Sequence, residues 1–495
     1  MHRRIFVLFV PAFCFMLIVT GLYLGRDHIT RLSHIYLPLK QAQEPQSSPV
    51  SSGLSSIIPT SSSISASSLS LSSSSIPTSI SFATSTPIPN PSKTINNSQQ
   101  TSASSTTPSA SYASAGPSKI PIADGKILSA KRISPYITAI LDPNSKLLPR
   151  LECPPLKTKR YEVLRKKQYT RDEMAKGQDI DFFFALNLRD CVDLLPRLMG
   201  SIVEAVRFLG PHRCALSIVE GNSPDGTSDV LIALRPYLEE IGLAYIYSNS
   251  AINPSKGARI RKLAELRNLA LKPLYKKTVK VTEETTVLFI NDVAACTEDL
   301  LELAYQRKTL NADMTCAMDW VYLSDNPTFY DVWVARGISG DTFFPLPGGS
   351  WDEAWNLLSS PPETKARFDA LMPFQVFACW NGATAFTAAP LLHGLHFRDP
   401  KKDECFQGEP QLFCKDLWYR HYRKIAVVPS VNLEYSDEKG ADIKNLKGYA
   451  SEIVSQQHPD NDRIEWRREP PEKVNCMPSF DNQRWLPWNE SLPLR

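Results

Sequence analysis

The stretch Thr286-Val287-Leu288-Phe289-Ile290-Asn291-Asp292-Val293 joins an apolar run rich in β-branched residues to a carboxylate. The run predicts a buried strand, and residues 296–301 after it, Cys-Thr-Glu-Asp-Leu-Leu, predict a capped helix start. Ligands of open α/β sheets bind beyond the carboxyl ends of the strands. Asp292 is therefore expected where a metal ion bound to phosphate could be held. The alternative is a strand that ends in an ordinary Asx turn.

Two more segments carry groups suited to a nucleotide. Glu220 ends a second apolar strand and could accept hydrogen bonds from a ribose or a base, although it could equally be a surface turn acid. A basic amphipathic helix over residues 256–271 places Arg259 or Arg261, and Arg267, near the rim of the sheet. Guanidinium groups suit diphosphates because they donate in a planar fork. Arg267 stands out because apolar residues line its face of the helix, whereas a charged helix face is more often solvated.

Two later segments have side chains suited to a sugar acceptor. In residues 377–384, Phe-Ala-Cys-Trp-Asn-Gly-Ala-Thr, the ring of Trp380 and the amide of Asn381 suit the C–H faces and hydroxyls of sugars, and the alternative, which such a pattern more often marks, is a core strand with a tight turn. Residues 404–418 place Glu404, Glu409 and Asp416 around two cysteines. This acidic cluster could hold an acid/base group or an acceptor-binding carboxylate, or be a loop braced by a disulfide.

Composition narrows the class of protein. The chain has 495 residues and a net charge of +4, without a polybasic block or a basic face with interleaved aromatics, so nucleic acid is not an expected partner. The ten cysteines form no Cys-x-x-Cys pair, which argues against a zinc ribbon. In an oxidising compartment Cys405 and Cys414 are candidate disulfide partners, but the sequence does not settle the connectivity.

The N-terminal part predicts a membrane anchor and a stalk. Residues 5–24 are almost wholly apolar and follow Arg3 and Arg4, so they predict a spanning helix with a cytosolic N-terminus. A cleavable signal peptide is the alternative, but its apolar region is usually shorter. Residues 45–92 contain no charged residue and are rich in Ser, Thr and Pro, which is typical of an O-glycosylated stalk. We expect a tail and anchor over 1–26 and a disordered stem over 27–150.

The rest, residues 151–495, is expected to be one lumenal domain with its core at 180–435. Strands and helices alternate from residue 181 to the strand centred on Leu288, which indicates a mostly parallel sheet covered on both faces. The predicted strands are 181–186, 214–220 and 244–247, and the predicted helices are 194–209, capped by Asp193, and 229–240. Beyond Leu310 the short strands 313–320 and 427–433 predict a mixed-sheet half. Past Tyr435 we expect a wrapping tail.

Taken together, these segments resemble the fungal capsule-associated α-1,3-mannosyltransferases, the cryptococcal mannosyltransferase group. The similar pieces, in order, are residues 184–189, 219–227, 261–268, 289–293, 316–320, 379–382 and 405–417. The resemblance implies a type II Golgi membrane enzyme with a GT-A fold. It implies that mannose moves from GDP-mannose to a mannose-containing glycan, with retention at the anomeric carbon and with help from Mn²⁺ or Mg²⁺.

The resemblance also implies roles for single residues. Asp292 takes the place of the metal-binding acid and Glu220 that of a nucleoside contact, and Arg189, Arg261 and Arg267 complete the candidate donor site. Trp380, Asn381 and Asp416 are the candidate acceptor site. One departure matters, because a GT-A site usually has Asp-x-Asp and this chain has Asn291-Asp292-Val293. Water or phosphate could supply the second ligand.

The expected mechanism follows from charge. Breaking the bond between sugar and phosphate builds negative charge on the diphosphate and positive character on the sugar ring. A cation and Arg267 would stabilise the first, and a carboxylate, Glu409 or Asp319, would stabilise the second. Two other hypotheses stay open at this point: a non-catalytic glycan-binding surface or wall protein on a mucin-like stalk, and a transferase that uses another sugar donor.

Overall fold

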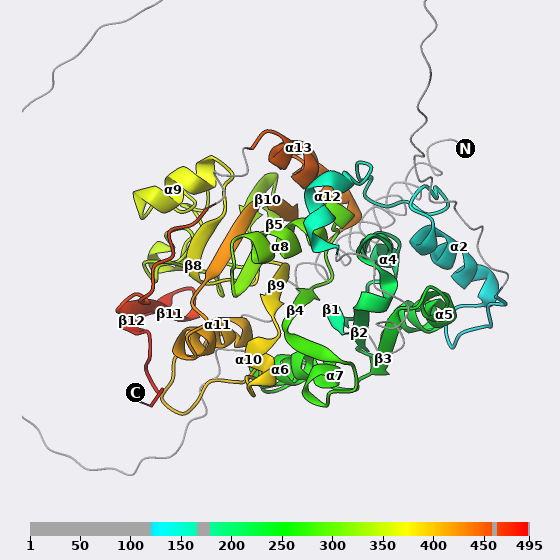
Figure 1. Ribbon diagram of the computed structural model, residues 1–495. Helices are drawn as coiled ribbons and strands as arrows, with labels where there is room; N and C mark the ends of the chain where they lie inside the picture. The colour runs from blue at the N-terminus through cyan, green and yellow to red at the C-terminus, as the bar shows by residue number, and fades with distance from the viewer. Residues whose placement is uncertain (1–119, 166–178, 458–462, 494–495) are drawn as a thin grey trace, which may run out of the picture. The chain divides into compact units, whose positions relative to one another are not determined.

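The computed structural model describes residues 120–165, 179–457 and 463–493. A ten-stranded sheet runs through them (Figure 1). Its first half consists of β1 (Ile180–Leu188), β2 (Cys214–Glu220), β3 (Ala244–Asn249) and β4 (Val281–Ile290), in the order β3-β2-β1-β4. All neighbours in this half pair in parallel, which confirms the predicted parallel half. The order of these four strands and their parallel direction match one half of a doubly wound nucleotide-binding sheet.

The second half of the sheet is mixed, as predicted. β9 (Ala383–Thr387) lies antiparallel between β4 and β5 (Met314–Leu323), and β10 (Ile425–Leu433) is parallel to β5. The edge is formed by β8 (Phe374–Ala378) and β7 (Arg336–Gly337), both added antiparallel, and β6 (Asn326–Phe329) pairs with β5 alone. Because β9 reverses direction, its start meets the end of β4, and this brings the turn before β9 to the edge where Asp292 lies.

Helices cover both faces of the sheet because its strands are apolar on both sides. In β1, Phe182 and Phe184 pack into one core while Phe183 and Ala185 pack into the other. The first core is covered by α2 (Ala130–Leu141), α4 (Leu195–Leu209), α5 (Thr227–Glu240) and α8 (Thr297–Thr309). The second is covered by α6 (Arg259–Ala270), α7 (Lys272–Tyr275), α10 (Ala389–Leu392) and α11 (Glu409–Tyr419), which lie together in Figure 1.

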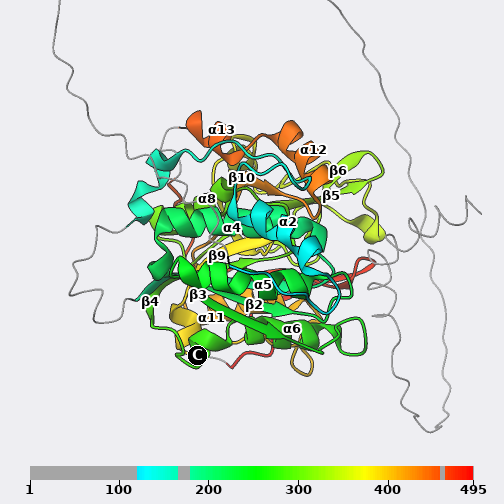
Figure 2. The same ribbon diagram turned by 90° about the vertical axis from the view of Figure 1, so that its right-hand side faces the viewer.

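Residues 120–150 belong to the folded unit. Helix α2 packs on α4 and α5, as Figure 2 shows. The carboxylate of Asp229 in α5 accepts hydrogen bonds from the backbone N–H groups of Lys126, Ile127 and Leu128 at 2.7–2.9 Å. The stem boundary predicted at residue 150 therefore falls inside this unit. The remaining stem, residues 27–119, and the predicted anchor at 5–24 lie outside the described residues, among which no helix is long and apolar enough to span a membrane.

Other local predictions were wrong. Asp193 does not cap α4, because a 3-10 turn (Val192–Leu194) precedes that helix. Asp225 accepts the hydrogen bond from the backbone N–H of Val192 instead, at 2.9 Å. The polar end, for which a wrapping tail is expected, has regular secondary structure. It forms α12 (Asp437–Lys447), α13 (Ala450–Ser455) and a hairpin of β11 (Lys473–Ser479) and β12 (Asn482–Pro487).

The described residues contain three disulfides, Cys153–Cys296, Cys316–Cys379 and Cys405–Cys476. The candidate pair Cys405–Cys414 is therefore wrong. Cys414 faces inward from α11, where its thiol lies 3.4 Å from the carbonyl oxygen of Cys379, and it stays free. Cys405 precedes α11 and reaches the C-terminal hairpin, which no local spacing could indicate.

The remaining elements are short. They are the 3-10 turns Thr158–Leu164, Pro211–Arg213 and Pro347–Gly349, and the helix α9 (Pro362–Asp369). Residues 166–178, which follow the first of these turns, lie outside the described part of the chain.

Candidate active site

Asp292 lies directly after β4, at the carboxyl edge of the parallel strands, and is half-buried. Apart from its own backbone N–H, no described residue donates a hydrogen bond to its carboxylate. Burial raises the pKa of Asp292 to about 6, and the positive charge of Arg267 acts in the opposite direction. A carboxylate placed in this way has its lone pairs free for a ligand.

The backbone on both sides of Asp292 is tied to other elements. The N–H of Asn291 donates to the carbonyl of Gly382 at 2.9 Å, and the N–H of Ala294 donates to the carbonyl of Glu434 at 2.7 Å. Asp292 therefore sits on a rigid corner, although its own side chain is uncommitted.

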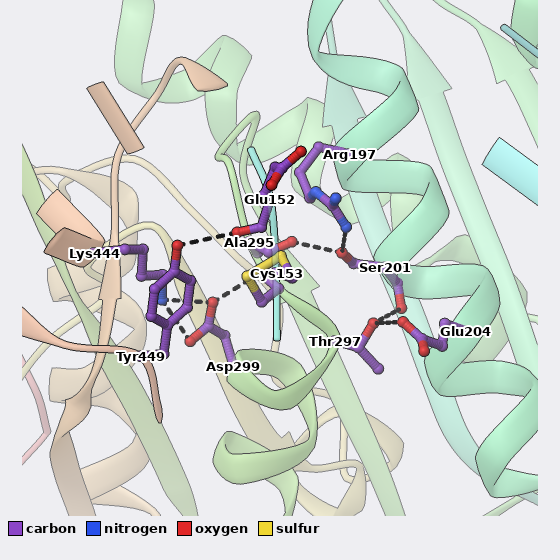
Figure 3. The surroundings of a disulfide bond; sticks show 11 residues. Glu152, Cys153, Arg197, Ser201, Glu204, Ala295, Thr297, Asp299, Lys444 and Tyr449 are labelled. Atoms are coloured by element: carbon purple, nitrogen blue, oxygen red, sulfur yellow. Dashed lines mark hydrogen bonds and ion pairs between the residues drawn. A yellow bond between two sulfur atoms is a disulfide. The ribbon is translucent and has the colours of Figure 1, made fainter. Parts of the chain in front are cut away.

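Beyond this corner the chain is fixed around the disulfide Cys153–Cys296 (Figure 3). Asp299 accepts from the N–H of Cys296 at 2.8 Å, which confirms the predicted capped start of α8. Both oxygens of Asp299 also bind the ammonium group of Lys444 from α12 at 2.7 Å. From α4, the hydroxyl of Ser201 donates to the carbonyl of Ala295 at 2.6 Å. Three elements thus hold the segment that follows Asp292.

Arg267 comes to this edge from α6. Its Nε donates to Oε1 of Glu409 at 2.8 Å, and its guanidinium carbon lies 4.2 Å from the ring centroid of Trp380. The indole N–H of Trp380 in turn donates to the side-chain oxygen of Asn291 at 3.1 Å. The terminal nitrogens of Arg267 make no hydrogen bond with described residues, so they are available to an anion.

The turn Trp380-Asn381-Gly382 between β8 and β9 is both a tight turn and part of the site. Asn381 and Gly382 have φ of 56° and 80°, the left-handed region that glycine adopts without strain. A Cβ at Gly382 would also lie 3.2 Å from the Cβ of Asp319, so the close approach requires glycine. The amide of Asn381 donates to the carbonyl of Ala317 at 2.8 Å, and the disulfide Cys316–Cys379 ties the turn to β5.

Two carboxylates meet beneath this turn. Asp319 in β5 is fully buried, and its Oδ2 accepts from the hydroxyl of Tyr435 at 2.6 Å. Asp331, in the loop after β6, accepts from the backbone N–H of Asn381 at 2.9 Å. Burial, and then the charge of Asp331, raise the pKa of Asp319 well above its usual range. Neither Asp331 nor Tyr435 was predicted as a site residue, because each owes its place to a contact with another strand or turn, with Asn381 and with Asp319, and no local pattern displays such a contact.

Glu220 does lie at the end of β2, but its carboxylate is fully committed. It accepts from the N–H groups of Asn222 and Ser223 at 3.1 and 2.9 Å, from the Ser223 hydroxyl, and from the amide of Asn249 at 2.6 Å. It is also fully buried. These contacts shape the loop after β2 and leave no oxygen for the predicted contact with a nucleoside. Arg189 lies beside this loop, close to Gly221, and is half-exposed.

Two predicted site residues make their ion pairs away from Asp292 and Arg267. Arg261 is exposed and pairs with Asp399 at 2.9 Å. It is six positions from Arg267 and so on another face of the helix, whereas Arg259 precedes Arg267 by two full i+4 steps. The charge of Arg259 reaches Tyr330 beside the carboxylates.

Asp416 lies about 10 Å along α11 from Glu409. Its two oxygens bind Arg398 at 2.7 and 2.9 Å, in a separate ion network.

The described residues at this edge offer a divalent cation one protein ligand. Asp292 supplies a free carboxylate, and no group of three or more His, Cys, Asp or Glu in the described chain is placed to hold a metal by itself. Mg²⁺ is commonly held by one or two carboxylates together with substrate phosphates and water. This single acid is therefore sufficient only when a phosphate-bearing donor shares the ion.

Comparison with known proteins decides the family. The family model described as "Cryptococcal mannosyltransferase 1" matches residues 181–416. The alpha-1,3-mannosyltransferase CMT1 of Cryptococcus neoformans var. neoformans serotype D is 36% identical over 340 residues, which covers 62% of this chain and 72% of that protein. The chain belongs to the cryptococcal mannosyltransferase family. It is a glycosyltransferase, which confirms the resemblance noted from its motifs.

Solved structures resemble this glycosyltransferase only distantly. S. aureus TarS 1–349 in complex with UDP aligns with a TM-score of 0.31 at 14% identity, over 56% of this chain and 66% of that one. The mannosyltransferase PcManGT from Pyrobaculum calidifontis, in complex with GDP-Man and Mn2+, aligns with a TM-score of 0.32 at 12% identity, over 57% of this chain and 67% of that one. Scores of this size are too low to assign residue roles.

The position of Arg267 in the glycosyltransferase predicts that lysine cannot replace it. Arg267→Lys keeps the charge but loses the planar fork and the stacking on Trp380, which together are worth about 2–3 kcal/mol. We expect kcat/KM for the donor to fall roughly 30- to 100-fold. Steady-state kinetics with varied donor would measure this. Arg261→Lys on the same helix is the matched control, and a loss as large as that of Arg267→Lys would contradict our placement of the two residues.

Proposed function

We propose that this enzyme transfers mannose from GDP-mannose to a hydroxyl of a mannose-containing glycan and forms an α-1,3 linkage with retention. Membership of the cryptococcal mannosyltransferase family supports mannosyl transfer. The observation that carries the proposal is the uncommitted carboxylate of Asp292 at the end of β4, beside the free guanidinium nitrogens of Arg267. The sheet order β3-β2-β1-β4 supports a GT-A-like donor domain.

In this proposal the donor lies across the carboxyl edge of the parallel strands. Arg267 donates from its two terminal nitrogens to the diphosphate, and Glu409 fixes the guanidinium plane through the 2.8 Å ion pair. Charge-assisted hydrogen bonds of this kind strengthen as negative charge develops on the departing diphosphate. Glu409 is thus a positioning residue and not the carboxylate that faces the sugar. Arg189 and the loop shaped by Glu220 border the end proposed for the nucleoside.

Asp292 would hold a divalent cation, Mn²⁺ or Mg²⁺, together with the donor phosphates. When bound, such an ion supplies positive charge that stabilises the leaving diphosphate. The protein's own residues orient the ligand and exclude water. The fixed backbone at Asn291 and Ala294 orients the carboxylate, and the ring of Trp380 shields the guanidinium of Arg267 from water.

We place the enzyme in the Golgi membrane as a single-pass type II protein with a lumenal catalytic domain. The apolar stretch at residues 5–24 and the preceding arginines support this placement. The three disulfides also support an oxidising compartment. Protease protection of the folded unit in sealed microsomes would test it, and digestion without detergent would contradict it.

The direct test is turnover by the purified full chain. We expect release of GDP from GDP-mannose that depends on an α-mannoside acceptor and on Mn²⁺ or Mg²⁺, and we expect a new α-1,3 bond in the product by NMR. UDP-glucose, UDP-xylose and UDP-GlcNAc are the control donors. Turnover with one of these alone would show another donor specificity. Glycan binding without affinity for any sugar nucleotide would favour the non-catalytic alternative.

A further inference from the structure

The carboxylates of Asp319, which is fully buried, and Asp331, which is half-buried, form a pair to which the proposed donor chemistry gives no role. They lie on the two sides of the β5–β6 hairpin, where the backbone N–H of Tyr330 donates to the carbonyl of Asp319 at 3.0 Å, and the turn at Asn381 covers them. Because the negative charge of Asp331 opposes ionisation of the Asp319 carboxyl, the pair is expected to retain one proton at neutral pH.

The two members of the pair have unequal surroundings. Oδ2 of Asp319 accepts from Tyr435, but its Oδ1 is buried and has no hydrogen-bond partner in the described part of the chain. A buried charge on such an oxygen would be costly. Asp331 is only half-buried, and its Oδ1 makes no hydrogen bond with described residues. The retained proton therefore belongs on Asp319, and Asp331 is the ionised member with a free oxygen.

Other acidic groups near this pair are committed elsewhere. Glu409 is bound to Arg267, and Asp292 is assigned to the donor phosphates. Beside the pair stands Tyr330, whose ring packs edge-on against Tyr435 at 5.0 Å. As 41% of Tyr330 is exposed, its ring offers a wall for the C–H face of a sugar. The free carboxylate oxygen of Asp331 therefore lies near an aromatic ring on which a sugar could pack.

We propose that Asp331 accepts the proton of the attacking acceptor hydroxyl, while Asp319 is a positioning residue that keeps its own proton. This inference rests on the proposed mannosyl transfer. The acceptor oxygen forms its bond to the anomeric carbon on the face from which the diphosphate departs, so the configuration is retained, and the bond from that carbon to the diphosphate breaks with its electron pair on the diphosphate. The hydroxyl proton moves to Oδ1 of Asp331. The substrate class at this subsite is a neutral sugar hydroxyl.

The electrostatic surroundings of Asp331 predict a pH dependence. Burial raises the pKa of Asp331 to about 6, and its hydrogen bond from Asn381 opposes the rise. The charged and titratable groups that act on the pair are Asp319, Arg267, Glu409, Arg336 and Tyr435, with Tyr330, Asp292 and Arg259 next to them. Because the ionised form accepts the proton, kcat should fall as the pH drops through about 6, and this acid limb should be less steep in Asp331→Asn, where Asp292 alone still titrates in that range.

The experiment compares three asparagine substitutions in the purified full chain, assayed for mannosyl transfer. Asp331→Asn imitates the protonated acid, so we expect kcat to fall about 10²- to 10⁴-fold, while the affinity for GDP-mannose stays within about threefold. Asp319→Asn imitates the form that this residue already has, so we expect a loss of about tenfold or less. Asp313→Asn is the matched control. It lies at the other end of β5, where its carboxylate accepts from the backbone of Lys424, and activity should not change.

Three results would overturn the inference: a kcat for Asp331→Asn within about threefold of the parent, a rise in the acceptor KM alone, or an equal loss in Asp319→Asn and Asp331→Asn. If Asp331→Asn does not fold, the parent protein still decides, because a kcat without an acid limb between about pH 5 and 7 also overturns it. A parent chain that neither binds nor turns over GDP-mannose is a different outcome, which removes the proposed function itself.

Discussion

Asp292→Ala is expected to reduce mannosyl transfer at least about 10³-fold, because it removes the one uncommitted acid at the end of β4. The loss should appear in kcat as well as in KM, since the charge that the residue helps to neutralise grows in the transition state. GDP release at saturating acceptor, measured over a range of Mn²⁺ concentrations, gives both parameters. More metal should not restore activity, because the ligand itself is missing.

Asp292→Asn separates this role from any effect on folding. Burial raises the pKa of Asp292 to about 6, above its usual value, so stability is lost as the pH rises from the usual carboxyl range through about 6, and the whole penalty is present above that value. At pH 7.5 the neutral asparagine should therefore give an equal or higher melting temperature with the same loss of activity. Asp325→Ala, in the exposed turn between β5 and β6, is the control. Retention of more than a tenth of the activity in Asp292→Ala would refute the assignment.

Lys444→Met is expected to destabilise the protein by about 3–5 kcal/mol. Lys444 and Asp299 are each only 1% exposed and lie 2.7 Å apart, so removing the ammonium group leaves a buried charge without a partner. The pair anchors α12 to the start of α8, which directly follows the Asp292 corner (Figure 3). Chemical denaturation with the disulfides intact measures the change, and activity should fall with the loss of structure.

The matched control for this prediction lies on the same helix. Lys439 pairs with Asp442 at 3.1 Å, but both side chains are about half-exposed, so Lys439→Met should cost no more than about 1 kcal/mol. The double substitution Lys444→Met with Asp299→Leu should recover much of the stability, because neither charge is then left unpaired. Equal costs for Lys444→Met and Lys439→Met would show that burial does not set the strength of the Lys444 pair.

Local sequence signals were strong in the parallel half of the sheet. The second predicted strand agrees with β2, and the strand before Asp292 was placed correctly because it is apolar, β-branched and followed by a capped helix. Arg267 could also be singled out, since helical periodicity shows which residues share its apolar face. Each of these features depends on neighbours within one or two turns of the chain, which a sequence displays directly.

The sequence by itself therefore determined that this is an α/β glycosyltransferase with an acid at the end of β4 and an arginine facing it. Only the tertiary structure decided that Glu409 forms an ion pair with Arg267, that Asp416 forms an ion pair with Arg398, and that Asp331 lies beside Asp319. It also paired Cys405 with Cys476. The physical reason is that these partners lie beyond the one or two turns of chain that a local pattern covers, so packing sets their distance and burial and no local period records either.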